Sequence, residues 1–214
     1  MKQSKAIIFD LDGVICHTDK FHYLAWKKIC DDKNLVFNKK INEKLKGISR
    51  IESYKIILNE NNLSEDINEI QTSISKKNDY YKDYLKKMDE SYVSDDVKNT
   101  LFKLKEKGYL LAIGSSSKNA KFILNQIKLI DLFDAISDGT NISKSKPDPE
   151  VFLKAAQMLD ISPSNSFVVE DAYSGIQAAL NAKMIAFAIN QNNTSFNNNN
   201  VIKIKKLSQI LNFI

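Results

Sequence analysis

Short apolar runs that alternate with helical patterns constrain the fold of this 214-residue chain more than any other feature. Residues 6–9 form an apolar run that ends at Asp10. Four further apolar runs of strand length follow, at 109–113, 133–136, 167–169 and 184–188. Strands that alternate with helices are typical of a parallel sheet covered by helices on both faces. We therefore expect a doubly wound α/β core.

Helical patterns precede or separate the later runs. They cover residues 18–33, 95–107, 118–128, 148–159 and 174–182. Gly108 stands directly after one of them, at a position where glycine commonly ends a helix. The polar, Asn-rich run 190–200 predicts a surface loop. Residues 201–214 predict a short strand followed by a closing helix.

The stretch from residue 34 to residue 92 carries no strand pattern. Its helical patterns lie near 50–61 and 64–88, and they are rich in Lys, Asn and Glu. Helices placed between the first strand and all the others predict an inserted domain. The expected division is an all-helical domain at residues 16–92 and a core made of residues 1–15 and 93–214.

The net charge of +5 does not by itself indicate a nucleic-acid partner. Lysines are interleaved with acidic residues, as at Glu43 and Lys44, and no basic stripe carries aromatic residues for base stacking. We therefore expect no nucleic acid among the partners of this chain.

The cysteines and the N-terminal residues indicate a compartment. Cys16 and Cys30 do not make a disulfide framework, and they fit reducing surroundings. The first apolar run is interrupted by Asp10 and Asp12, unlike that of a signal peptide. No apolar stretch reaches the length of about 18 residues that a membrane span needs. We expect a cytoplasmic monomer with no membrane partner.

The 31 lysine and arginine residues include a single arginine, Arg50. Ser49 and Glu52 have the spacing of a capping box, which predicts a helix that begins at Arg50. Arginine holds a phosphate or carboxylate through two parallel hydrogen bonds, which lysine cannot do. Arg50 is thus either a functional anion ligand or an isolated surface residue in a lysine-biased composition.

The residues that follow the predicted strands are those expected to carry chemistry, because ligands of an open parallel sheet bind beyond the carboxyl ends of its strands. The candidates there are Asp10, Asp12, Ser115, Lys146, Glu170 and Asp171. Carboxylates gathered at one edge repel each other unless a hard cation lies among them, and oxygen ligands suit Mg²⁺. The lysine and the hydroxyl group supply positive charge and donors for a phosphate.

Each candidate has a simpler explanation when taken alone. An aspartate at a strand end commonly serves in a turn, and Ser115 to Ser117 fit a helix-capping turn. A lysine before proline is usually solvated. Compatible chemistry at successive strand ends nevertheless predicts a phosphoryl-transfer site that uses Mg²⁺.

This set of motifs resembles the signature of the haloacid dehalogenase-like superfamily. The first motif is Asp10-Leu11-Asp12-Gly13-Val14-Ile15, and the others are Ser115, Lys146-Pro147 and Glu170-Asp171, in the expected order. The resemblance covers the core from end to end. It implies a Rossmann-like core with an inserted cap, in a superfamily that contains many phosphatases.

The resemblance also implies a role for each core residue. Asp10 would be the nucleophile that forms an aspartyl-phosphate, and Asp12 would exchange a proton with the substrate oxygen. Ser115 and Lys146 would bind the phosphoryl oxygens. The implied Mg²⁺ ligands are Asp10, the backbone carbonyl of Asp12, Asp171, and Glu170 either directly or through an intervening ligand.

The predicted insert resembles the cap of β-phosphoglucomutases. The similar segments are Leu45-Lys46-Gly47-Ile48-Ser49-Arg50, Phe21-His22 with Ala25-Trp26-Lys27, Lys76-Lys77-Asn78-Asp79, and Ser115-x-Ser117-Lys118-Asn119 of the core. Such enzymes hold a sugar bisphosphate, so they need a phosphate site far from the nucleophile. The resemblance implies that role for Arg50, with Lys118 and Asn119 as further candidates.

The complete set of substrate-binding residues implied by this resemblance is Thr18, His22, Lys46, Gly47, Arg50, Lys77, Ser117, Lys118 and Asn119. Gly47 would let the backbone approach the sugar closely. His22 and Lys77 resemble cap residues that couple closure to Asp12, although His22 is equally well explained as a packed residue. Trp26 and the nearby tyrosines are interpreted as packing.

The sequence departs from the family pattern at two places. Cys16 and His17 precede Thr18 where close relatives carry an aspartate, and Ala172 replaces a small polar residue after the last motif. The first change falls in the predicted hinge. Cys16 is not expected to be a nucleophile, because no base accompanies it.

Three functions remain open at this point. The first is a mutase that interconverts β-D-glucose 1-phosphate and glucose 6-phosphate through β-glucose 1,6-bisphosphate. The second is a Mg²⁺-dependent phosphatase that acts on a small sugar phosphate or phosphoglycolate. The third is a catalytically silent binding module, which would be expected to lose Asp10 or Asp12.

Overall fold

The computed structural model describes residues 5–45, 49–191 and 195–214. The chain divides into two compact units, which we call the sheet unit (Met1–His17 with Met88–Ile214) and the helical unit (Thr18–Lys87). The sequence placed the corresponding boundaries after residues 15 and 92. No helix among the described residues combines the length and apolar character needed to cross a membrane.

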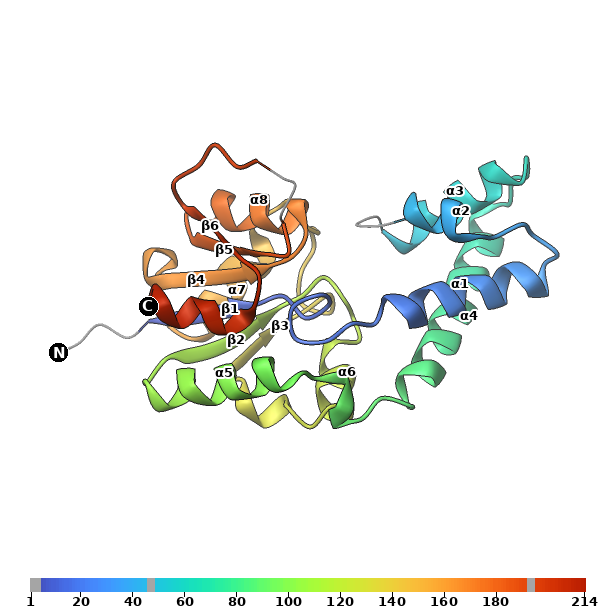
Figure 1. Cartoon of the computed structure of the whole chain (residues 1–214). Coiled ribbons are helices and arrows are strands. Elements are labelled where there is room, and N and C mark those ends of the chain that lie inside the picture. The colour runs from blue at the N-terminus through green and yellow to red at the C-terminus, as the bar shows by residue number, and fades with distance from the viewer. Residues whose placement is uncertain (1–4, 46–48, 192–194) are drawn as a thin grey trace. The chain divides into compact units, whose positions relative to one another are not determined.

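The sheet unit is built on six parallel strands among the residues that the structure describes, in the order β3-β2-β1-β4-β5-β6 (Figure 1). Their bounds are β1 Ala6–Phe9, β2 Leu110–Gly114, β3 Ala135–Ser137, β4 Ser166–Glu170, β5 Ile185–Ile189 and β6 Val201–Ile204. β1 lies in the middle, where Ala6 is paired with Leu110 on one side and with Ser166 on the other. The chain therefore builds outward from β1 in both directions, and the doubly wound parallel sheet expected from the sequence is confirmed.

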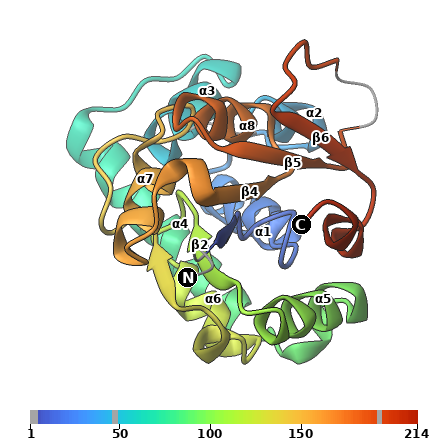
Figure 2. The ribbon, with the colours of Figure 1, turned by 90° about the vertical axis from the view of Figure 1, so that its left-hand side faces the viewer.

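Helices cover both faces of this sheet (Figure 2). α7 (Glu150–Met158) and α8 (Tyr173–Asn181) pack on one face, where Phe152 and Ile176 belong to a fully buried core with Ile8 and Val168. α5 (Asp95–Glu106) packs against β2 and against η4 (Leu207–Asn212). All four residues of β1 are completely buried, which explains why the strand reads as a continuous apolar run.

Local sequence signals set several boundaries in the sheet unit. The side chain of Ser94 accepts a hydrogen bond from the backbone N–H of Val97 at the start of α5. Gly108 follows the end of α5 with a φ of +82°. The remaining short helical elements are α6 (Ala120–Gln126), η1 (Glu90–Tyr92), η2 (Ile130–Leu132) and η3 (Pro163–Asn165).

Two local expectations need correction in this unit. The run at 133–136 is strand only from Ala135, because η2 and the extended Phe133 occupy the preceding residues. The closing helix is the short 3₁₀ element η4, which ends two residues before the C-terminus of the chain.

The helical unit contains α1 (Asp19–Asp32), α2 (Lys39–Glu43), α3 (Arg50–Glu60) and α4 (Ile67–Leu85). Trp26 of α1, Tyr54 and Ile57 of α3 and Ile74 of α4 share one apolar core. α2 was not expected, because it is too short to show a helical period. Its start is nevertheless marked by Asn38, whose side chain accepts a hydrogen bond from the N–H of Ile41.

The capping signals of the longer helices differ in completeness. Ser49 accepts a hydrogen bond from the backbone N–H of Glu52, but the Glu52 carboxylate accepts from Lys55 instead of completing a capping box. α4 has the complete box, with Asp66 accepting from the N–H of Glu69 while Glu69 accepts from the N–H of Asp66.

Candidate functional site

Three carboxylates meet at the carboxyl ends of β1 and β4, in the part of the chain that the structure describes. Because Phe9 is in register with Val169, Asp10 emerges beside Glu170. The backbone N–H of Asp10 donates to the carbonyl of Val169 at 2.9 Å. One carboxylate oxygen each from Asp10, Glu170 and Asp171 lies within 4.8 Å of the others. β1 and β4 also form the switch point of the sheet, where such folds bind ligands.

Lys146 reaches into this group from the loop between β3 and α7. Its Nζ donates to Asp10 Oδ1 and to Glu170 Oε2, the latter at 2.7 Å. The lysine side chain is only 9% exposed and lies over the Phe152 ring, with Nζ 4.8 Å from the ring centre. The structure therefore brings together Asp10, Lys146, Glu170 and Asp171, as the sequence predicted.

Two glycines let the backbone come close to these carboxylates. Gly13 follows Asp12 in the loop after β1 with a φ of +87°, and a Cβ there would lie 2.1 Å from Asp171 Oδ2. Gly175 lies in α8, and a Cβ there would lie 2.0 Å from Glu170 Oε2. Any larger residue at either position would collide with an acidic side chain of the cluster.

The loop after β2 forms a turn that is rich in hydroxyl groups. The N–H of Ser115 donates to the carbonyl of Ser137 at 3.0 Å, while Ser115 Oγ accepts from the N–H of Ser117 at 3.2 Å. Ser117 Oγ in turn accepts from the N–H of Asn119. Ser115 and Asn119 are buried and Lys118 is exposed. The helix-capping interpretation and the phosphate-binding interpretation of Ser115 both agree with this geometry.

A second group of candidate residues lies in the helical unit. Lys77 Nζ is 2.9 Å from His22 Nδ1, although Lys77 is only 2% exposed. The ammonium also lies 4.9 Å from the Trp26 ring centre and 4.8 Å from that of Tyr81. The His22 ring stacks on Tyr81, and the Tyr81 hydroxyl hydrogen-bonds Thr18 Oγ1 at 2.8 Å.

Arg50 is the first residue of α3, and its positive charge acts on His22. Thr18, His22, Arg50 and Lys77 therefore belong to one neighbourhood of the helical unit. Lys46 and Gly47, the other two candidates expected here, lie outside the described residues.

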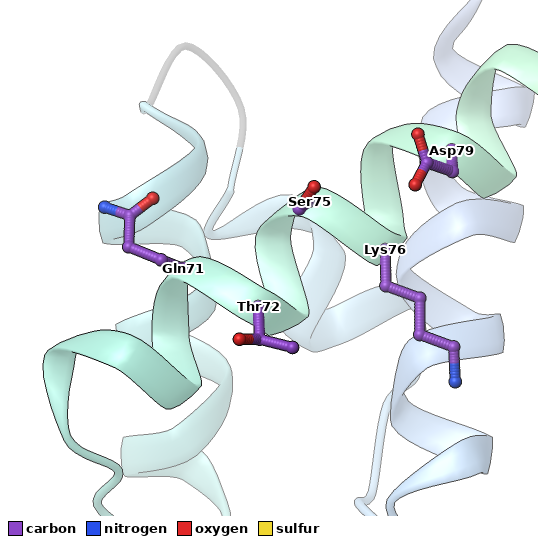
Figure 3. A pocket seen from close by; sticks show the side chains of 5 residues that line it. All are labelled: Gln71, Thr72, Ser75, Lys76 and Asp79. Carbon is purple, nitrogen blue, oxygen red and sulfur yellow. The ribbon is translucent and has the colours of Figure 1, made fainter.

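Two hollows of the helical unit lie away from these candidate residues. One of about 490 Å³ is lined by Gln71, Thr72, Ser75, Lys76 and Asp79, which project from α4 in Figure 3. Another of about 390 Å³ runs between α1 and α4 and shares Thr72 and Lys76 with the first. None of the candidate site residues lines either one, and the exposed Lys76 contrasts with its buried neighbour Lys77.

Comparison with known proteins decides the family. Residues 7–189 match the family described as haloacid dehalogenase-like hydrolase. The chain belongs to the haloacid dehalogenase-like hydrolase family. As one of its members, the chain is 41% identical to the β-phosphoglucomutase of Bacillus subtilis over 87% of this chain and 84% of the relative.

Other members of the family are also similar. The crystal structure of a β-phosphoglucomutase from Clostridium difficile is 32% identical, with a TM-score of 0.84 over 97% of this chain and 93% of that one. A phosphorylated carbohydrates phosphatase of Thermotoga maritima is 24% identical over 83% of this chain and 81% of the relative. The haloacid dehalogenase-like core expected from the four motifs is thus confirmed.

Burial and the neighbouring charges together shift the pKa values of the Asp10, Asp171 and Lys146 side chains. Burial raises the pKa of Asp10, and Glu170 adds to the rise while Lys146 opposes it. Burial and then the Glu170 carboxylate raise the pKa of Asp171 to about 7. Burial alone would lower the pKa of Lys146, but the Asp10 and Glu170 carboxylates outweigh it and raise the pKa above its ordinary value.

A divalent cation fits these residues. Three buried or half-buried carboxylates face one ammonium group among the described residues, so ionising all of them leaves net negative charge away from water. Oxygen ligands and negative charge are what Mg²⁺ prefers. Burial is the largest cause of the raised pKa values of Asp10 and Asp171, and the neighbouring Glu170 carboxylate adds to both.

In the helical unit the charges that act on the buried His22 side chain are positive. Burial lowers the pKa of His22, and the charges of Lys77 and Arg50 lower it further. His22 is therefore held neutral beside two cations.

Cys16 of the sheet unit is buried, and burial followed by the nearby Asp12 raises the pKa of its thiol. This agrees with the prediction that Cys16 is not a nucleophile.

Sequence reasoning missed several residues that shape the site. Phe152 lies beneath the Lys146 ammonium, Gly175 leaves room for Glu170, and Glu150 binds the loop that carries Lys146. Gly175 offered a weak signal, since glycine is unusual inside a helix. Glu150 offered only the i,i+4 spacing to Lys154, because its loop partners are two backbone N–H groups and the Ser143 hydroxyl.

Proposed function

We propose that this chain is a Mg²⁺-dependent β-phosphoglucomutase. It would interconvert β-D-glucose 1-phosphate and glucose 6-phosphate through an aspartyl-phosphate and β-glucose 1,6-bisphosphate. The observation that carries the chemistry is the buried group of Asp10, Lys146, Glu170 and Asp171 at the switch point of the sheet. The 41% identity to the Bacillus subtilis enzyme supports the choice of a sugar phosphate as substrate.

Asp10 acts as the nucleophile in this proposal. One of its carboxylate oxygens attacks the phosphorus atom of the bisphosphate, so a carboxylate–phosphorus bond forms while the bond to the sugar oxygen breaks. Asp12 donates a proton to that departing oxygen. In the reverse direction Asp12 takes the proton from the attacking sugar hydroxyl, and Asp10 is released as a carboxylate.

The residues around Asp10 stabilise charge during this transfer. Lys146 is already in contact with the nucleophile, and with Ser115 it would bind the phosphoryl oxygens. We assign a Mg²⁺ site to Asp10, the Asp12 carbonyl, Glu170 and Asp171, where the charge of the ion screens the repulsion between carboxylates and phosphoryl group.

The remaining candidates serve the sugar phosphate. Arg50 is assigned to the second phosphate, because a guanidinium binds phosphate through two hydrogen bonds and no ion pair of Arg50 is found within the described ranges. We assign substrate binding in the helical unit to Thr18, His22 and Lys77 as well. Ser117, Lys118 and Asn119 are assigned to substrate binding in the sheet unit, and Lys46 and Gly47 complete the set.

A phosphatase on small phosphorylated sugars is the alternative function. The similarity to the Thermotoga maritima phosphatase favours it, since the chain covers most of that relative. The two functions share the first chemical step and differ in the acceptor of the phosphoryl group, which is a sugar hydroxyl in a mutase and water in a phosphatase.

An assay with β-D-glucose 1-phosphate, Mg²⁺ and a trace of β-glucose 1,6-bisphosphate separates the two. We expect glucose 6-phosphate to appear faster than inorganic phosphate, with both signals abolished by EDTA. Inorganic phosphate as the main product would support the phosphatase instead. Neither product, from a folded protein with Mg²⁺ present, would contradict both functions.

A further inference from the structure

The loop that carries Lys146 is unusually exposed for a segment that places a buried side chain. It runs from Asp138 to Pro149 between β3 and α7. Asn141, Ser143, Lys144, Ser145 and Pro147 are all exposed, whereas the Lys146 side chain is only 9% exposed. Holding an exposed loop in one conformation costs conformational entropy, so some interaction has to fix its position.

Glu150 supplies that interaction. Its Oε2 accepts hydrogen bonds from the N–H of Ser143 at 2.9 Å, from Ser143 Oγ at 2.8 Å and from the N–H of Lys144 at 2.7 Å. Its other oxygen is 2.9 Å from Lys154 Nζ, and Lys154 also donates to the carbonyl of Asn141. One carboxylate thus binds the loop at the two residues that lie just before Ser145 and Lys146.

α7 makes Glu150 a firm anchor. Val151, Phe152 and Ala155 of this helix are fully buried, and the Phe152 ring lies under the Lys146 ammonium. The Lys154 side chain and the donors of Ser143 and Lys144 lower the pKa of Glu150 to about 2, so the carboxylate stays ionised at neutral pH. The loop is therefore attached to the same rigid helix that forms the floor beneath its lysine.

We propose that Glu150 is a positioning residue, which holds Lys146 against Asp10 and Glu170 by binding the loop at Ser143 and Lys144. Glu150 touches neither the nucleophile nor the metal-binding carboxylates in this proposal, and it acts only through Lys146. The proposal rests on the proposed role of Lys146 in phosphoryl transfer, but not on whether the acceptor is a sugar or water.

Phosphorylation of Asp10 by acetyl phosphate with Mg²⁺, followed by intact-protein mass spectrometry, tests the catalytic consequence. We expect Glu150→Ala to slow this step by about tenfold or more, as is typical when a supporting contact is lost. Glu150→Gln keeps an amide oxygen for the loop donors and should recover much of the rate. Glu90→Ala is the matched control, since Glu90 lies outside this loop and pairs with the exposed Lys128.

A double-mutant cycle separates positioning from a general loss of stability. If Glu150 acts through Lys146, Lys146→Met with Glu150→Ala should be no slower than Lys146→Met alone. Multiplying effects, or a Glu150→Ala rate equal to that of the wild type, would overturn the proposal. Urea unfolding of each variant identifies a rate loss that merely follows unfolding, which would also count against it.

Lysine acetylation with acetic anhydride tests the positioning without any catalysis. In Glu150→Ala, labelling of Lys146 should rise severalfold, while Lys105, which is paired with Asp134 in the same unit, should not change. Unchanged labelling of Lys146 would overturn the proposal. If wild-type Asp10 takes up no phosphate, the proposed function fails, and this labelling result still decides the role of Glu150.

Discussion

The two units bury charge of opposite sign and surround it differently. In the sheet unit, Asp10 and Glu170 both lie against Lys146, and Asp171 adds a further carboxylate. In the helical unit, Lys77 lies between two aromatic rings beside a neutral histidine. An excess of carboxylates suits a metal ion and the phosphoryl chemistry next to it, whereas cations held against rings suit an anion.

Burial shifts the pKa of Asp10 and of His22 in opposite directions, because one side chain is an acid and the other is a base. Burial disfavours every charged form, so it raises the pKa of Asp10 and lowers that of His22. Both groups are thereby pushed toward the neutral form. In the sheet unit the Lys146 ammonium opposes this rise in the pKa of Asp10 without reversing it, and in the helical unit an added anion would favour the protonated form of His22.

The largest effect is expected from removing the nucleophile on the carboxylate side. Asp10→Asn should lower phosphoryl transfer by about 10⁴-fold or more, because an amide oxygen is a far weaker nucleophile than a carboxylate. Intact-protein mass spectrometry measures the phosphorylation of residue 10, and the formation of glucose 6-phosphate measures the overall turnover. Asp138→Asn is the matched control, since Asp138 is also buried but lies outside the cluster and bonds Thr140. Equal losses in both variants would contradict a special role for Asp10.

The next effect tests how tightly the carboxylates are packed. Gly175→Ala should cost about 3 kcal/mol of unfolding free energy, because the new Cβ overlaps Glu170 in a filled core. Urea denaturation of the isolated variant measures it. At Gly108 nothing lies within 4 Å of an added Cβ, so Gly108→Ala reports only the strain of a positive φ, about 1 kcal/mol. A Gly175→Ala variant as stable as the wild type would show that the cluster can shift.

A third prediction tests the cation side. Arg50→Ala should lower mutase turnover by about a hundredfold, which corresponds to about 3 kcal/mol for a lost charged hydrogen-bonding partner. Phosphorylation of Asp10 by acetyl phosphate should remain near the wild-type rate. Lys55→Ala is a control on the same helix, because Lys55 pairs with the exposed Glu52. Full mutase activity in Arg50→Ala would remove Arg50 from the second phosphate site.

The smallest effect concerns His22 and the stability of the helical unit. The pKa of His22 lies below its ordinary value of 6.5 in the folded chain, so the unfolded chain binds the proton more tightly. Stability should therefore fall as the pH drops below about 6.5, by at most about 1.4 kcal/mol per pH unit for one proton. His22→Gln should remove that part of the slope in urea unfolding between pH 7 and pH 5. An unchanged slope would show that His22 is not the group responsible.

The sequence predicted β1, β2, β4 and β5 well, because each is a short and largely buried run, and burial leaves a clear apolar signature. It also predicted which residues follow the strands, and topology then brought Asp10, Glu170 and Asp171 to one place. Elements without a repeating apolar pattern were harder to predict from the sequence. α2 has only five residues, and η4 is a 3₁₀ element whose apolar residues look like those of a short α-helix.

The sequence carried little signal for residues that leave space beside another side chain or that hold a loop in place. Gly175 matters through the space it leaves beside Glu170, and Glu150 matters through backbone donors that any loop possesses. The position of Lys77 between Trp26 and Tyr81 depends on how α1 and α4 pack, which no local pattern encodes. The assignments of Thr18, His22, Arg50 and Lys77 to substrate stay predictions.

The central place of β1 has a consequence for how the chain is made. Ala6 is synthesised before both of its partners, so one edge of this apolar strand stays open until Leu110 is made and the other until Ser166 is made. The helical unit is one continuous segment with mostly local contacts, which favours rapid folding. We expect the helical unit to fold before β1 pairs with β4. A ribosome-bound chain ending near residue 160 should therefore expose the unpaired edge of β1 to chaperones.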